Sequence, residues 1–185
     1  IHIIRDPRGA VASLVRMPWA PGSISLCNFA CAVEHREVAP FRDKLCEVRL
    51  EDLLRDPRET MGRILDFVGE EWDDAVLDHS RNAPSSDVPP FPWLLTATGK
   101  RREATERWSD TLSPAWIRVI EATQRGGMER GSYARAKLDR EPGRLRCVLA
   151  VLLDLPRTLL AIATITVSYT HLRAHETKAN LVCRL

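Results

Sequence analysis

The stretch IHIIRDPRGAVAS, residues 1–13, predicts a strand, a turn and a helix in direct succession. Residues 1–4 form a short apolar run that a charged turn ends, as is typical of a buried strand in a parallel sheet. From Ala10 onward the apolar side chains recur at helical spacing, and Pro7 stands just ahead, where a helix start tolerates proline. The chain begins with Ile rather than Met, inside the expected strand, so we expect it to start partway through a larger domain.

A second unit of the same kind follows along the chain. Residues 44–50 alternate as a strand does, residues 51–57 form a turn, and residues 58–68 predict a helix that Gly69 closes. Two strand, turn and helix units in succession favour an α/β fold with a parallel sheet flanked by helices.

Further helices are expected at residues 24–38 and from Ser113-Pro114 to about Met128, because Ser is a good N-cap and Pro suits the first helical position. Residues 83–93 are too rich in proline for regular structure and predict a long loop.

Composition limits the function classes. The 185 residues suit one domain, and 27 basic against 25 acidic residues give a net charge of +2. That balance is too even for a general nucleic-acid or membrane-surface binder, so any anion site must be local. The five cysteines form neither a C-x-x-C pair nor a metal-ligand pattern, and their odd number argues against a disulfide framework. We expect free thiols and no bound metal.

The C-terminal part divides into three segments. Residues 135–144 read as a polar linker, and residues 145–166 as an apolar helix interrupted by Asp154, Pro156 and Arg157. These interruptions favour a helix that packs on the domain over membrane association. Residues 167–185, VSYTHLRAHETKANLVCRL, resemble the translation of a sequencing adapter, and we exclude them from functional reasoning. They carry three basic residues and one acid, so the remainder is formally neutral.

The turn after the first expected strand has the chemistry of an anion site. Arg5 offers a fixed fork of donors that matches phosphate oxygens and stays charged. The strand end would place it at the carboxyl edge of the sheet, and the helix start would add backbone N–H groups and a favourable dipole. The alternative is an Arg5 paired with Asp6 or another carboxylate, with Ser13 a plain surface residue of the helix.

Residues 3–13 closely resemble the 3′-phosphate-binding motif of sulfotransferases, both cytosolic and Golgi carbohydrate enzymes. In that family an Arg after the strand and a Ser eight residues later bind the 3′-phosphate of the sulfate donor PAPS. The resemblance implies these roles for Arg5 and Ser13, and it implies a P-loop-type, three-layer sulfotransferase fold.

Further matches follow in the order of the family. Residues 48–57, VRLEDLLRDP, resemble its R-Y-E-D-L and D-P run, with Leu50 in place of a Tyr that contacts adenine in cytosolic members. Glu51 and Asp52 read as helix-starting, structural acids. Ser80 corresponds to a hydroxyl residue that lies against the adenine. Arg101 and Arg102 correspond to an R-K-G stretch on the 3′-phosphate, although the family's Gly is Glu103 here.

Trp108, after Arg101 and Arg102, reads as a packing residue. Residues 131–133, Gly-Ser-Tyr, resemble the end of many such domains, so the resemblance covers about residues 1–134 as the C-terminal portion of a sulfotransferase domain.

The resemblance implies an enzyme that transfers a sulfuryl group from PAPS to a hydroxyl or amine acceptor, with a carbohydrate favoured. The family's phosphosulfate loop, P-K-S-G-T-T or R-S-G-T-T, does not occur in the sequence, and its catalytic base lies before the motif. We therefore expect catalytic residues upstream of residue 1 and an inactive isolated chain. A Golgi enzyme and a bacterial cytoplasmic enzyme both stay open. So do two alternatives: another phosphate-binding α/β enzyme, such as a nucleotide kinase relative, and a degenerate non-catalytic domain.

Overall fold

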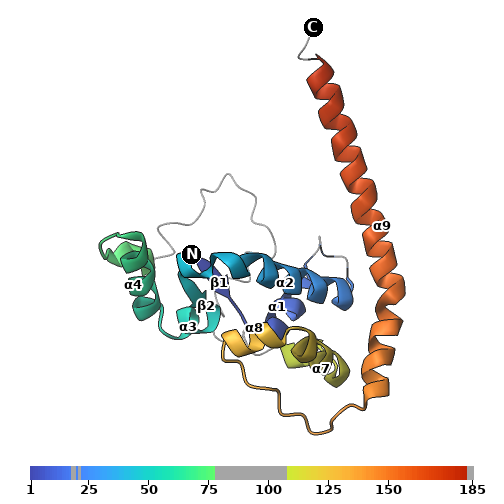
Figure 1. Cartoon of the computed structure of the whole chain (residues 1–185), viewed down its shortest axis with the longest axis horizontal. Helices are drawn as coiled ribbons and strands as arrows, with labels where there is room; N and C mark the ends of the chain where they lie inside the picture. Colours follow the sequence, from blue (N-terminus) through green and yellow to red (C-terminus); the bar gives the residue numbers. More distant parts are fainter. Residues whose placement is uncertain (18–19, 21, 78–107, 183–185) are drawn as a thin grey trace.

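The computed structural model describes residues 1–17, 20, 22–77 and 108–182, with the helix alone for residues 165–182. Its elements are β1 (His2–Ile4), α1 (Pro7–Leu14), α2 (Ile24–Val38), η1 (Ala39–Lys44), β2 (Glu47–Arg49), α3 (Leu50–Arg55), α4 (Pro57–Val68), η2 (Asp74–Leu77), α6 (Trp108–Thr111), α7 (Pro114–Thr123), α8 (Arg125–Arg130) and α9 (Arg144–Val182). The fold is rich in helix (Figure 1).

The two predicted strand, turn and helix units lie side by side. Strands β1 and β2 pair in parallel, with Ile3 beside Val48, and form a two-stranded sheet in the part of the chain that the structure describes. The α/β class is therefore confirmed, while the complete three-layer P-loop-type fold stays a prediction. Strand β2 is shorter than the alternation of residues 44–50 predicted, because η1 continues α2 through Lys44.

Local signals set the ends of α2 and α4 where the sequence indicated them, but the turn predicted at residues 51–57 is wrong, because α3 occupies most of it. Helix α2 spans the predicted residues, and the Ser23 side chain accepts a hydrogen bond from the backbone N–H of Leu26. Helix α4 starts at Pro57 after the Asp56 cap and ends at Gly69, whose φ of 78° is in the left-handed region that favours glycine.

The single helix predicted from Pro114 to about Met128 is wrong in one respect. The chain instead forms α7 and α8, separated at Gln124, where the backbone leaves helical geometry. Gly126 and Gly127 follow after Arg125, and glycine is a poor helix former. Gly127 also packs closely, since a β-carbon there would lie 3.1 Å from His35 Nε2. The break lets α8 approach α2.

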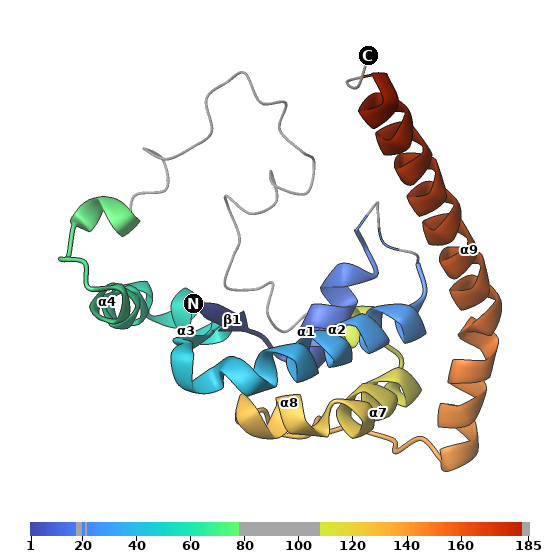
Figure 2. The same cartoon turned by 45° about the horizontal axis from the view of Figure 1, so that its top comes forward.

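The core lies between α1, α2 and α7, which surround the turn after β1 (Figure 2). Its buried members are Val11, Ala12, Cys27, Cys31, Leu112, Trp116, Ile117 and Ile120. Cys27, Cys31, Cys46 and Cys147 are free thiols, which agrees with the prediction for these four.

Helix α9 follows a linker at residues 133–143 that has neither helix nor strand, close to the predicted linker. The helix passes through Pro156 without ending and extends beyond the predicted residues 145–166. Its N-terminal half lies along α7 and α2, and its C-terminal half projects away from the body (Figures 1 and 2). The predicted loop at residues 83–93 lies outside the described residues.

Candidate functional site

The Arg5 side chain folds over the first turn of α1. A β-carbon built on Gly9 would lie 3.0 Å from Arg5 Nε and 3.5 Å from the guanidinium carbon. Gly9 is buried, so the guanidinium rests on the helix where a larger residue would displace it. A glycine four residues after the arginine thus has a steric reason, because glycine permits a close approach to backbone.

Ser13 lies on the same face of α1, one turn beyond Gly9. Residues four apart are neighbours on a helix surface, so Ser13 stands next to Gly9, on which the Arg5 guanidinium rests. Both side chains are only partly buried. Of the predicted site residues, the structure thus brings Arg5 and Ser13 to one face.

Arg16 adds a second positive charge that the sequence-based prediction missed. It follows α1, its side chain is exposed, and its Nε donates to the backbone oxygen of Ala12 at 3.1 Å. Its charge is near enough to Arg5 to disfavour the protonated guanidinium there. The signal in the sequence is spacing, since Arg16 stands three residues after Ser13 and so shares its side of the helix.

The electrostatic environment of Arg5 is mixed. Burial has the largest effect on the pKa of Arg5 and lowers it, and the positive charge of Arg16 acts in the same direction. The carboxylates of Glu51 and Asp6 oppose that shift. A partly desolvated guanidinium beside another cation favours an added anion, because charges interact more strongly where water is partly excluded.

The carboxylate of Asp6 belongs to its own turn. Asp6 caps α1, with Oδ1 accepting from the backbone N–H and the Nε of Arg8, both at 2.9 Å, and Oδ2 accepting from Arg8 NH2 at 2.6 Å. We predicted that backbone N–H groups at the start of the helix would help to bind an anion. This is wrong for the Arg8 N–H, because it already donates a hydrogen bond to the Asp6 carboxylate. Anion binding here depends on side chains.

Arg8 connects the turn to the C-terminal helices. Its NH1 donates to Glu121 Oε1 on α7 at 2.7 Å, and its guanidinium lies over the Trp108 ring, 4.3 Å from the centroid. The Arg8 side chain is 5% exposed and that of Glu121 8%. Trp108 also packs against the hydrophobic core, as predicted for a packing residue.

Glu51 also holds the turn after β1 in place. Glu51, in the first turn of α3, accepts from the Asp6 backbone N–H at 3.0 Å through Oε1 and from the Tyr133 hydroxyl at 2.8 Å through Oε2. Burial and the hydrogen bond to Glu51 raise the pKa of Tyr133. The Arg49 guanidinium covers the Tyr133 ring at 4.7 Å. The structural role predicted for Glu51 therefore includes holding the Arg5-Asp6 turn.

The comparisons with known proteins give one match. Residues 1–74 match the model described as "Sulfotransferase family". We call residues 1–74 the sulfotransferase segment because of this similarity. No curated protein and no solved structure matched the chain.

The sulfotransferase segment contains Arg5, Ser13, Arg16 and Glu51, but not all of the residues that hold them in place. Glu121 and Tyr133 follow the matched residues: Glu121 contacts Arg8 directly, and Tyr133 contacts Glu51. The match over residues 1–74 agrees with the predicted sulfotransferase family, and that family suggests the class of enzyme. Particular roles of residues within the segment remain predictions.

The remaining predicted positions are less informative. Leu50 begins α3, at the place where the family has Tyr. Ser80, Arg101 and Arg102 lie outside the described residues, so their predicted contacts with adenine and phosphate are untested.

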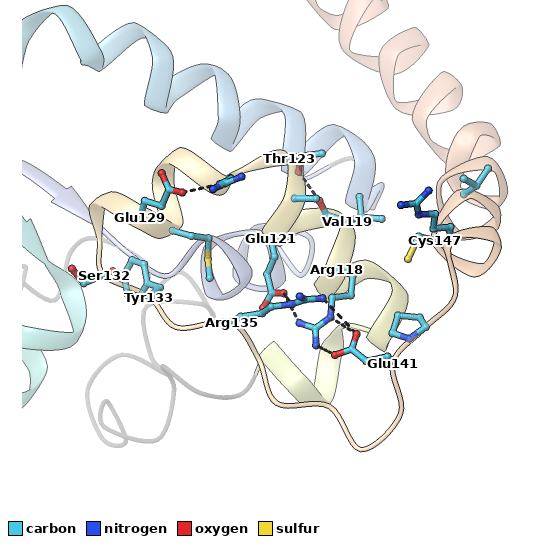
Figure 3. Close-up of a pocket in the computed structure, with 16 residues that line it drawn as sticks. Arg118, Val119, Glu121, Thr123, Glu129, Ser132, Tyr133, Arg135, Glu141 and Cys147 are labelled. Atoms are coloured by element: carbon cyan, nitrogen blue, oxygen red, sulfur yellow. Dashed lines mark hydrogen bonds and ion pairs between the residues drawn. The ribbon is translucent and has the colours of Figure 1, made fainter.

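A cavity of about 970 Å³ lies away from Arg5 and Ser13, beside α7, α8, the linker and the start of α9 (Figure 3). Several of its charged lining residues pair with one another: Arg118 donates to Glu121 at 2.5 Å and also bonds to Glu141, while Arg135 NH2 lies 3.6 Å from Glu141. Hydrogen bonding to Glu141 raises the pKa of Arg118. Glu121, which lines the cavity, also holds Arg8 at the turn. The cavity itself is not the predicted phosphate site.

Proposed function

We propose that this chain carries the 3′-phosphate-binding part of a sulfotransferase that uses PAPS as its sulfuryl donor. The observation that carries the proposal is the placement of Arg5 over Gly9 with Ser13 one turn further on the same face of α1, within the sulfotransferase segment. A guanidinium and a hydroxyl group both donate hydrogen bonds that the oxygens of a terminal phosphate can accept.

Arg16 would take part in this site as a second, more exposed cation. A phosphate monoester carries close to two negative charges at neutral pH, and one arginine leaves part of that charge unbalanced. The nearby carboxylates of Asp6 and Glu51 are already occupied by Arg8, Tyr133 and a backbone N–H, which limits their repulsion of the ligand.

The reaction would be an in-line attack of an acceptor oxygen or nitrogen on the sulfur of PAPS. Its charge stabilisation and proton removal belong to a phosphosulfate loop and a base that we place upstream of residue 1. The residues of the two motifs at 5–8 and 49–57 favour a carbohydrate hydroxyl as acceptor. On this proposal the chain alone binds nucleotide weakly and transfers no sulfuryl group.

A pair of nucleotides isolates the 3′-phosphate. Adenosine 3′,5′-bisphosphate and adenosine 5′-phosphate differ by that group alone, and NMR titration detects millimolar binding. The bisphosphate should bind about tenfold or more tightly, since a hydrogen bond to a charged group contributes about 1.5–3 kcal/mol. Arg5→Ala should abolish this difference, and Arg16→Ala should reduce it.

Arg63→Ala is the matched control, because Arg63 is exposed on α4. It should leave both affinities unchanged. Saturable binding of ATP with an affinity equal to that of the bisphosphate would favour a nucleotide kinase relative. No saturable binding of the bisphosphate, or binding that Arg5→Ala leaves intact, would favour a degenerate domain and refute the proposal.

A further inference from the structure

Helix α9 presents an apolar surface to solvent. Residues Arg144–Thr164 have a mean hydropathy of 1.8, and only 11% of this stretch is buried in the body. The large side chains exposed on it are Leu145, Val148, Leu149, Leu152, Leu153, Leu155, Leu159, Leu160 and Ile162. An exposed apolar surface of this extent marks an interaction site more often than it occurs by chance.

The helix is divided lengthwise into two faces. Its body-facing stripe contains Ala150, Val151, Asp154, Thr158 and Ala161, which are buried or packed against the core. At 3.6 residues per turn, the leucines at positions 145, 152 and 159 fall on the opposite side. The exposed apolar residues are therefore a continuous outward face and not scattered positions.

The charges on this stretch are all of one sign where solvent reaches them. Arg144, Arg146 and Arg157 are exposed. Asp154 is the one acid in the sequence from Arg144 to Thr164, and it is 4% exposed. An apolar face bordered by arginines and free of exposed carboxylates complements a surface that is apolar below and negative above, as an anionic bilayer is.

Asp154 determines how such a helix can lie. Its Oδ2 accepts from the Ser23 hydroxyl and from the Ser25 backbone N–H, both at 2.8 Å, at the start of α2. Thr158 joins the same group through a 2.8 Å contact with Ser23. These bonds hold the middle of the apolar stretch against the protein body, so it cannot cross a bilayer while they persist.

We propose that the outward face of α9 binds the surface of an anionic lipid bilayer, with the helix lying along the surface. The leucines enter the boundary between headgroups and acyl chains, and the arginines contact lipid phosphate and carboxylate groups. A second copy of the chain fits this face less well, because a symmetric contact would bring arginines together without any exposed acid between them.

Vesicle flotation of the full chain tests the proposal. The chain should float with vesicles of phosphatidylcholine and phosphatidylserine at low salt, and less with phosphatidylcholine alone or in 0.5 M NaCl. Leu152→Glu should weaken the partition about tenfold or more, since it puts a charge where the proposal has a leucine entering the bilayer. Phe67→Glu on α4 is the matched control: Phe67 and Leu152 are each 50% exposed. It should leave the partition unchanged.

Paired substitution of Arg146→Glu and Arg157→Glu should remove the preference for the anionic lipid, at about fivefold per arginine. Circular dichroism of each variant verifies that α9 still forms. Equal flotation of the Leu152→Glu and Phe67→Glu chains would overturn the proposal. So would a dimer in sedimentation velocity that Leu152→Glu dissociates, when the chain does not float with either vesicle. These outcomes are independent of nucleotide binding, so the two proposals fail separately.

Discussion

Replacing Glu121 with Gln should destabilise the chain far more than its single charge suggests. The Glu121 carboxylate lies between two buried arginines: Oε1 accepts from Arg8 at 2.7 Å and Oε2 from Arg118 at 2.5 Å. Oε1 also accepts from the backbone N–H of Ala136 at 2.7 Å. An amide keeps one oxygen and turns its NH2 group toward a guanidinium, where donor faces donor.

The expected cost follows from burial. The side chains of Arg8 and Arg118 are 5% and 9% exposed, so the loss of Glu121 leaves charge without compensation in a site that water barely reaches. Breaking a buried pair by removing one partner typically costs about 3–5 kcal/mol. Asp6 and Glu141 each retain two hydrogen bonds to one of the arginines, which places the estimate near the lower limit, about 3 kcal/mol. For a chain of this length that lowers Tm by about 6–12 °C.

Glu129→Gln is the matched control for this experiment. Glu129 pairs with Arg125 four residues earlier on α8, at 2.7 Å, but the two side chains are 65% and 81% exposed. Exposed pairs contribute little to stability because water screens them, so Tm should fall by no more than a few degrees. Differential scanning calorimetry of the three chains measures both shifts. Equal values of Tm for the two variants would show that the Arg8, Glu121 and Arg118 network does not stabilise the fold, and the reasoning would be refuted.

Three further changes test other parts of the structure. Gly9→Ala should weaken bisphosphate binding in the NMR titration, because the added methyl group would lie 3.0 Å from Arg5 Nε. Gly62→Ala is its control: Gly62 has open space around it, so the substitution should leave binding intact and stabilise α4 by about 0.5–1 kcal/mol. Burial raises the pKa of the Cys31 thiol from 9.0 to about 11, so the folded state favours the neutral thiol. The stability linked to this thiol is complete below pH 9 and is lost as pH rises toward 11, about 2–3 kcal/mol in all. The urea midpoint of the chain should therefore fall over that pH range, and Cys31→Ala should make this fall shallower. An unchanged slope of the midpoint against pH contradicts the assignment. Asp154→Ala should release α9 from α2, seen as faster amide exchange in residues 144–164, and equal exchange in the two chains would show that other contacts hold the helix.

The predictions that succeeded rest on local chemistry. Ser23, Asp56 and Gly69 act within one turn of their own position, so caps and turns fix the bounds of α2 and α4 from sequence alone. The parallel pairing of β1 and β2 follows from two successive strand, turn and helix units. The division of α7 from α8 was missed because periodicity continues through Gln124, and only the packed structure shows the close approach to His35 that gives Gly127 a tertiary reason.

The candidate site was predictable in part for the same reason. Arg5 and Ser13 are eight residues apart, and their common face follows from the helix between them. Glu51 was expected to start a helix, and nothing within its neighbourhood in the sequence indicates a bond to Asp6 or Tyr133. Contacts across 45 and 82 residues depend on how the helices pack, which a single sequence does not specify.

The contacts of Arg8 also explain why the turn after β1 carries two arginines with different roles. Arg8 is held by Asp6, Glu121 and Trp108, so its charge is consumed inside the fold. Arg5 lies on the helix surface, partly exposed and next to another cation. An Arg8→Lys chain would keep the charge but lose the planar group that serves both carboxylates and the indole, so it should lose stability first. An Arg5→Lys chain should keep its stability and lose affinity for the 3′-phosphate. The order in which the two variants lose folding and binding therefore separates the structural arginine of the turn from the one proposed to bind the ligand.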